Sequence, residues 1–255
     1  MPDPGNRPSD AGRLLSLLWP PSTGARRGPD RSRTLNDVVD AAITIANRDG
    51  LAAVTMRAVA AELGVGTMTL YHYVPSKASL VALMIDRLYE QMPRPPLEQL
   101  SATERLQRVA RLNRELFLTH SWLADTSSAR PPLGPGLMAK YEYELNAFTA
   151  LGLDDVSTDD CLIYLLTFVH GAARADLAAR RQQLESGITD QEWWNVYGPL
   201  FDQIFDKHRY PTAARIGGAA GATRGAAYNP DQAFDFGLER TIDAINALGQ
   251  DASST

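Results

Sequence analysis

The stretch MRAVAAELGVGTMTLYHYVPSK, residues 56–77, changes character halfway along its length. In its first part, 56–63, apolar residues recur at the spacing of an amphipathic helix, and Gly64 ends the pattern. The second part, 67–73, carries threonines, tyrosines and a histidine, with Leu70 as its inward-facing apolar residue. Two short helices joined by a tight turn that contains glycine are typical of a helix-turn-helix. We therefore predict this motif, with a second helix that exposes a polar face.

The side chains of the second helix suit contacts with DNA. In a helix-turn-helix the second helix enters the major groove, where threonine can contact base edges or a thymine methyl group. Tyrosine hydroxyls and lysine reach phosphates. A tyrosine on a short helix can also be half-buried packing, and Tyr73 could simply close the core beneath the next helix. Both interpretations stay open for Tyr73.

Segments on both sides of the motif complete a small helical domain. The segment 35–49 has the apolar stripe of an amphipathic helix. A long helix begins after its cap at Ser76 and ends before the PRPPL segment at 93–97. We assign residues 35–92 to a three-helix helix-turn-helix domain that includes the start of a connecting helix.

Helical periodicity continues through the rest of the chain. Residues suited to helix N-termini precede the periodic segments, and these are Thr55, Ser76, Ser101, Ser157, Thr189 and Pro230. No convincing alternating strand pattern and no internal repeat are found. We therefore predict an all-α protein, with a larger helical domain over 97–250.

The first 34 residues differ in composition from the rest of the chain. They are rich in Pro, Gly, Arg and Ser, and they carry six arginines against three aspartates, a balance of +3. Because the whole chain has a net charge of -5, the remainder carries -8. We predict a flexible basic arm over 1–34 that could contact phosphate through Arg26, Arg27, Arg31 and Arg33. A solubilising tail is the alternative.

Bulk composition excludes several classes of protein. The apolar fraction of 44 % and charged fraction of 22 % are ordinary for a globular protein, and we expect no membrane-spanning helix. The single cysteine, Cys161, allows no internal disulfide, so a cytoplasmic location is expected. His170 and His208 have no second ligand at helical spacing, and we predict neither a metal nor a cofactor.

The segment 55–90, TMRAVAAELGVGTMTLYHYVPSKASLVALMIDRLYE, resembles the DNA-binding domain of the tetracycline-repressor family. The resemblance implies a set of DNA-binding residues on the two helices of the motif and at the start of the next: Arg57, Thr67, Met68, Thr69, Tyr71, His72, Tyr73 and Lys77. Met56 departs from the small hydroxyl residue often found at its position, so we assign it no phosphate. The bases that these residues contact do not follow from the sequence.

The C-terminal segment 234–248 is similar to the last helix of the family's regulatory domain. This implies a homodimer built from that helix and the helix over 157–186, with two recognition helices about 34 Å apart on a palindromic operator of double-stranded DNA. Gly237 in mid-helix indicates a close helix crossing. The resemblance also implies a pocket for a small-molecule inducer, with candidate lining residues Trp122, Met138, Tyr141, Phe148, Tyr164, Phe168, Arg174, Trp193 and Tyr197. Packing in the core is the alternative for each of these rings.

We therefore predict a ligand-responsive, dimeric transcriptional repressor that a small molecule releases from its operator. No defensible nucleophile triad, glycine-rich phosphate loop or acid pair argues for an enzyme. Two alternatives remain, a helical protein-interaction module and a ligand-independent regulator or activator. Salt dependence separates the first alternative from DNA binding, because affinity for DNA falls steeply as salt rises.

Overall fold

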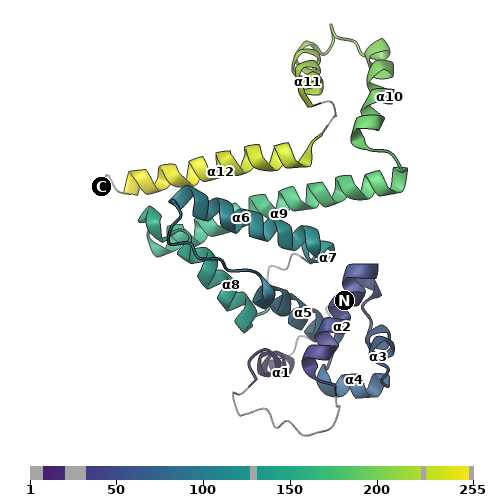
Figure 1. Ribbon diagram of the computed structural model, residues 1–255, viewed down its shortest axis with the longest axis vertical. Coiled ribbons are helices and arrows are strands. Elements are labelled where there is room, and N and C mark those ends of the chain that lie inside the picture. Colours follow the sequence, from purple (N-terminus) through teal and green to yellow (C-terminus); the bar gives the residue numbers. More distant parts are fainter. Residues whose placement is uncertain (1–7, 21–32, 127–130, 225–227, 253–255) are drawn as a thin grey trace.

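A computed structural model describes residues 8–20, 33–126, 131–224 and 228–252, and all regular elements within these ranges are helices. The all-α prediction is therefore confirmed. The elements, in chain order, are α1 (Pro8–Leu18), α2 (Leu35–Asp49), η1 (Leu51–Ala53), α3 (Met56–Leu63), α4 (Thr67–Tyr73), α5 (Lys77–Gln91), α6 (Ala102–Thr119), α7 (Ser121–Ala124), α8 (Pro135–Asn146), η2 (Thr149–Leu151), α9 (Asp155–Ser186), α10 (Asp190–Ile204), α11 (Pro211–Arg224) and α12 (Pro230–Ala252). Figure 1 shows α2–α4 at one end, α6 with α9 and α12 in the body, and α10 and α11 projecting beyond them.

Side-chain caps begin most of the helices that the sequence predicts. Thr55 accepts a hydrogen bond from the Ala58 N–H at 3.0 Å, and Ser76 caps α5 in the same way. Complete capping boxes start α6 at Ser101 and α10 at Thr189. The predicted start at Ser157 is wrong, because Asp154 caps α9 and the helix begins two residues earlier. An aspartate satisfies the first backbone N–H groups of a helix as well as serine does.

A first hydrophobic core holds the helix-turn-helix domain together. Val38 on α2, Val59 on α3, Leu70 on α4 and Leu80 on α5 are fully buried in it. Gly64 ends α3 with φ 68°, a left-handed conformation that glycine adopts without strain. After this turn α4 packs against α2 and α3, with Leu70 as its buried residue.

Part of the N-terminal segment that is predicted as a flexible arm over 1–34 forms a helix, so the prediction is wrong for that part. Residues 8–18 form α1, which packs against α5 and buries Leu18 in the first core. The Trp19 indole N–H donates to the Leu133 carbonyl at 2.7 Å, in the segment that leads into α8. Eleven residues are too few for a firm periodicity, and the stability of a helix this short comes from docking. Arg26, Arg27 and Arg31 lie outside the described residues.

A second hydrophobic core joins α6, α9 and α12. Leu106, Leu165 and Ile242 are fully buried in it, one from each helix. The crossing of α9 and α12 is close, as Gly237 indicated: a Cβ built on Gly237 would lie 2.4 Å from the Phe168 ring. Since this contact lies within one chain, a side chain at 237 would disturb the subunit's own fold.

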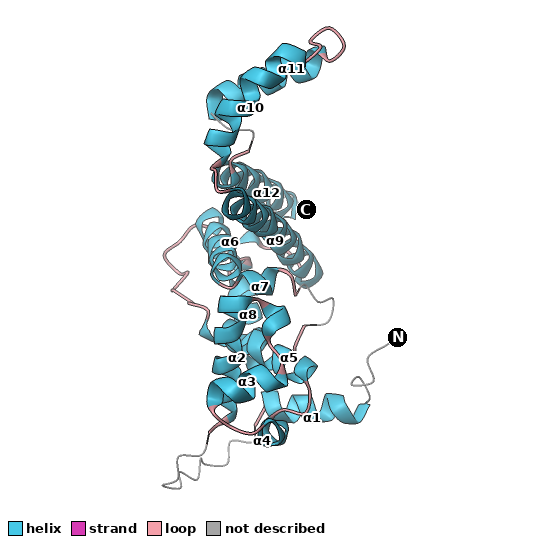
Figure 2. Cartoon of the chain, turned by 90° about the vertical axis from the view of Figure 1, so that its right-hand side faces the viewer, coloured by secondary structure: helices cyan, strands magenta, loops and turns pink. Residues whose placement is uncertain are grey.

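The long helix α9 has one buried and one exposed side. Cys161, Leu162 and Leu165 are buried, whereas Ile163 and Tyr164 are 55 % and 52 % exposed. The sequence predicts no membrane-spanning helix, but α9 is long and apolar enough to cross a membrane. The central helix of a soluble protein has the same length and composition, and α9 packs against α6 and α12. The exposed apolar side of α9 is therefore not covered by any described part of the chain. Figure 2 shows α9 running beside α12.

Candidate functional site

The outer face of α4 is the clearest candidate for a nucleic-acid interface. Its exposed residues are Thr67, Met68, Thr69, Tyr71 and His72, as the sequence predicts. Met68 is 75 % exposed, although methionine is a residue type that is most often buried. Leu70 is the one residue of α4 that is fully buried. A short helix is thus anchored by its inner side and offers hydroxyl, imidazole and thioether groups on its outer side.

Tyr73 differs from its neighbours on α4. It is half-buried and packs against the first core, and its hydroxyl donates to the Arg33 carbonyl at 2.8 Å. The Arg33 guanidinium in turn donates to the Leu63 carbonyl at the end of α3, at 3.0 Å. These contacts favour the packing interpretation, in which Tyr73 and Arg33 fix α4 against α3.

Two exposed cations belong to the helices directly before and after α4 in the chain. Arg57 lies in the first turn of α3 and is exposed. Lys77 is the first residue of α5; it is also exposed, and its Nζ donates to the Leu51 carbonyl at 3.3 Å. In a helix-turn-helix, cations on the helices that adjoin the second helix are able to contact phosphates beside the major groove.

Comparisons with known proteins identify the family of both parts of the chain. Residues 38–84 match the model of "Bacterial regulatory proteins, tetR family", and residues 94–248 match "Tetracyclin repressor-like, C-terminal domain". The chain belongs to the TetR family. The first match covers α3, α4 and most of α2 and α5, and the second begins after α5. The family resemblance drawn from residues 55–90 is therefore confirmed, and the family is one of regulators rather than enzymes.

Individual TetR-family proteins resemble nearly the whole chain. The HTH-type transcriptional repressor DrrR1 of Streptomyces coeruleorubidus is 36 % identical over 241 residues, which are 94 % of this chain and 87 % of that protein. The crystal structure of apo ActR from Streptomyces coelicolor superimposes with a TM-score of 0.70 at 25 % identity, covering 86 % of this chain and 98 % of ActR. ActR in complex with actinorhodin gives a TM-score of 0.69 at 26 % identity, covering 86 % and 99 % of the two chains.

The nine residues predicted to line a ligand pocket do not meet in one cavity. Trp122 is buried in the first core and donates from its indole N–H to Asn47 on α2, and Phe148 is buried in the second core. Phe168 stacks on Phe234, and the Tyr141 hydroxyl donates to Asp159 at 2.7 Å. These contacts favour the core alternative for Trp122, Phe148 and Phe168. The remaining six side chains are exposed on α8, α9 and α10, and these are Met138, Tyr141, Tyr164, Arg174, Trp193 and Tyr197.

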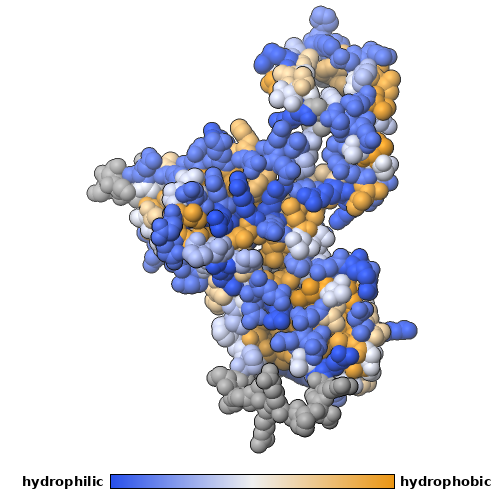
Figure 3. Space-filling view, in the orientation of Figure 1, coloured by the Kyte–Doolittle hydropathy of each residue, from blue (hydrophilic) through white to orange (hydrophobic). Residues whose placement is uncertain are grey.

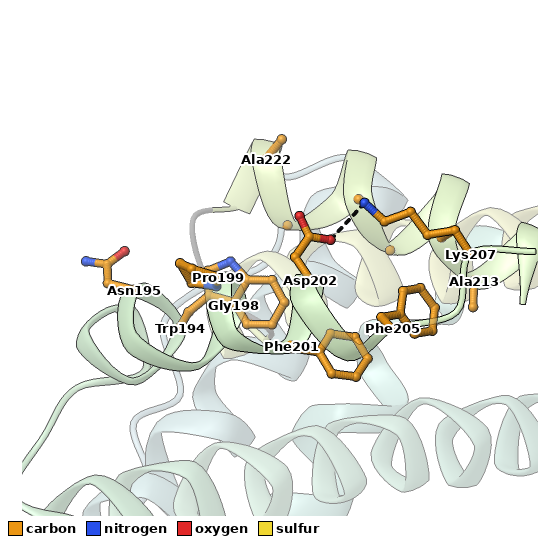
Figure 4. Close-up of a pocket in the computed structure, with 14 residues that line it drawn as sticks. Trp194, Asn195, Gly198, Pro199, Phe201, Asp202, Phe205, Lys207, Ala213 and Ala222 are labelled. Atoms are coloured by element: carbon orange, nitrogen blue, oxygen red, sulfur yellow. Dashed lines mark ion pairs between the residues drawn. The ribbon is translucent and has the colours of Figure 1, made fainter.

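A cavity of about 770 Å³ lies between α10 and α11, away from most of these residues. Figure 4 shows Phe201 and Phe205 beside it and an ion pair between Asp202 and Lys207 across its rim, with an N–O distance of 2.9 Å. Gly-rich and Ala-rich turns of α11 form the opposite wall. The sequence did not reveal this cavity, because α11 has no clear amphipathic pattern to show which side faces α10.

The projecting helices α10 and α11 expose apolar side chains, and no residue of either helix is buried. Figure 3 shows hydrophobic side chains at the surface of this projection. Leu200, Phe201 and Ile204 on α10 are 55 %, 49 % and 81 % exposed. Trp193 stacks on Tyr197 with ring centroids 4.7 Å apart, so these two predicted ligand residues contact each other.

Polar contacts hold the helix-turn-helix domain against the rest of the chain. The Asn47 side-chain oxygen accepts the Trp122 indole N–H at 2.9 Å and lies 2.9 Å from His120 Nδ1. Burial lowers the pKa of His120, which favours its neutral form at this junction. His170 is occupied by packing on Phe117 and by a contact with the Ala124 carbonyl at 2.7 Å. In the ranges that the structure covers, no three His, Cys, Asp or Glu residues gather as a metal site would require.

Proposed function

We propose that the chain is a dimeric transcriptional repressor that binds a palindromic operator in the cytoplasm and is released by a small molecule. The observation that carries the proposal is the outer face of α4, which exposes polar groups between Arg57 and Lys77. The relationship to the repressor DrrR1 supports repression, and the complex of ActR with actinorhodin supports response to a ligand. Base contacts are assigned to Thr67, Met68, Thr69 and His72, and phosphate contacts to Tyr71.

The dimer is assigned to the exposed apolar sides of α9 and α12. Ile163 and Tyr164 on α9 and Phe236 on α12 are each more than half exposed. A Cβ built on Gly171, further along α9, would have no neighbouring atom within 4 Å, so a second helix has room to approach there. A two-fold interface of these helices would bury the apolar sides and set two copies of α4 along one face of DNA.

Loss of phosphate contacts should weaken operator binding and its salt dependence. We expect Lys77→Ala and Tyr71→Ala to reduce affinity for the promoter of the protein's own gene. The slope of log affinity against log salt should become shallower by about one unit in Lys77→Ala, which removes a cation from a phosphate. It should stay unchanged in Tyr71→Ala, because a neutral hydroxyl releases no counterion. Fluorescence anisotropy over a salt series measures both quantities. Lys207→Ala, which removes an exposed lysine from the turn between α10 and α11, is the matched control. Unchanged affinity in the folded double variant would contradict the assignment of these two residues.

Ligand binding and operator binding should oppose each other. With actinorhodin as the probe, we expect one molecule per subunit to bind and to lower operator affinity by about 5- to 150-fold, and DNA to lower actinorhodin affinity by the same factor. Titration calorimetry with and without operator DNA measures the two factors. Operator affinity that is identical with and without bound actinorhodin would contradict its role as an inducer of this protein.

A further inference from the structure

Asp86 makes an unusual link between the two domains. It lies on α5, whose residues Leu80 and Met84 are fully buried in the first core, and it is itself only 6 % exposed. Its carboxylate points to the other domain and accepts hydrogen bonds from the first turn of α8. One oxygen accepts from the Leu137 N–H at 2.8 Å, and the other from the Gly136 N–H at 3.2 Å.

The N-terminus of α8 has no cap of its own. Gly134 occupies the capping position and supplies no side-chain hydrogen bond, and Pro135 has no N–H. The helices α2, α3, α5, α6, α9 and α10 are each capped by the side chain of the residue directly before them. Asp86 therefore supplies to α8, from a different domain, the hydrogen bonds that these helices obtain locally.

Glycines make the approach of the two helices possible. A Cβ on Gly134 would lie 2.3 Å from the Asp86 carboxylate, and a Cβ on Gly136 would lie 2.0 Å from the Asp86 carbonyl oxygen. The second contact is with backbone, which cannot move aside as the end of a flexible side chain can. Any residue larger than glycine at 136 would push α8 away from α5.

The ionised form of Asp86 is disfavoured by burial. Burial raises the pKa of Asp86, and the two backbone hydrogen bonds, which lower it, do not fully compensate. The folded state thus holds the proton more tightly than the unfolded state, and ionisation costs folding free energy as pH rises through the folded-state pKa.

We propose that Asp86 is a positioning residue that couples α8 of the regulatory domain to the connecting helix α5, and through α5 to Lys77 and α4. The proposal rests on the proposed function, because it assigns the joint through which ligand and operator affect each other. By linkage, a joint that carries a ligand signal to DNA must also carry the effect of DNA binding back to α8.

Hydrogen exchange of the α8 N-terminus, with promoter DNA as the probe, tests the joint without an inducer. In the wild-type protein we expect DNA to slow exchange at Met138 and the following residues of α8 by about 5-fold or more. These N–H groups bond to carbonyls of α8 and its cap, as Met138 does to Gly134, and not to Asp86. Asp86→Leu, which has similar size and no acceptor, should abolish this response, and Asp86→Asn, which keeps one acceptor, should reduce it. Glu90→Gln, which neutralises a carboxylate one turn further along α5, should leave the response at its wild-type size.

The outcomes separate the joint from the proposed function. Wild-type protein that binds no DNA from its own promoter would overturn the proposed function. Wild-type binding with no change in α8, or a response that persists in Asp86→Leu, would overturn the role of Asp86 alone. If Asp86→Leu does not fold, as judged by circular dichroism, Asp86→Asn and Gly134→Ala decide the question in the same assay. A merely structural role for Asp86 would alter melting but leave the DNA-induced difference in exchange.

Discussion

Lys140→Met should destabilise the folded subunit by about 3–5 kcal/mol, because it would leave the charge of Glu144 buried without its partner. The Lys140 ammonium contacts both Glu144 carboxylate oxygens at 2.7 Å, and the two residues are 7 % and 1 % exposed. The Asn113 amide also donates to Glu144, at 2.6 Å. Chemical denaturation followed by circular dichroism measures the loss.

The matched control for this pair is the double variant Lys140→Met with Glu144→Gln. It has nearly the same volume and no buried charge, and glutamine can still accept the hydrogen bond from Asn113. Replacing both members of a buried ion pair is often neutral or stabilising, so we expect most of the lost stability to return. A single variant that is as stable as the double variant would show that the Glu144 charge is not confined within the core.

Ile163→Glu should separate the proposed dimer and with it abolish tight operator binding. In a two-fold interface the substitution occurs twice, and each buried carboxylate without a partner costs about 3 kcal/mol or more. At a fixed subunit concentration we expect operator affinity to fall by at least about 100-fold, which corresponds to roughly 2.8 kcal/mol. Analytical ultracentrifugation and anisotropy measure the two effects.

Phe236→Glu should have the same effect from the other helix of the proposed interface. Leu15→Glu is the control, because it places a carboxylate at an exposed apolar position of α1, which packs on the helix-turn-helix domain. An intact dimer for both Ile163→Glu and Phe236→Glu would mean that the interface lies on another surface. Substitutions at Gly237 and Leu166 would not test the dimer interface cleanly, because both positions have contacts within the same chain. Gly237 faces Phe168, and Leu166 packs against the second core.

Local elements and family membership could be predicted from the amino-acid sequence. Helix starts at Thr55, Ser76, Ser101 and Thr189 were predictable because a cap is formed by residues within three positions of one another. The exposed face of α4 followed in the same way, since helical periodicity places Leu70 on one side and the polar residues on the other. The segment 55–90 carried enough of this pattern to identify the TetR family.

The meeting of distant segments depends instead on the tertiary structure. Trp122 and Phe168 are aromatic residues in segments with helical periodicity, and that periodicity does not reveal which residues they contact. In the structure the Trp122 indole bonds to Asn47 on α2, and the Phe168 ring lies against Gly237 on α12. The docking of α1 and the capping of α8 by Asp86 likewise join residues about 50 or more positions apart. An aspartate among the apolar residues of α5 was a visible signal, but its partner was not. Local hydrogen bonds are encoded by neighbouring residues, whereas contacts between helices depend on the packing of the whole chain, which periodicity does not specify.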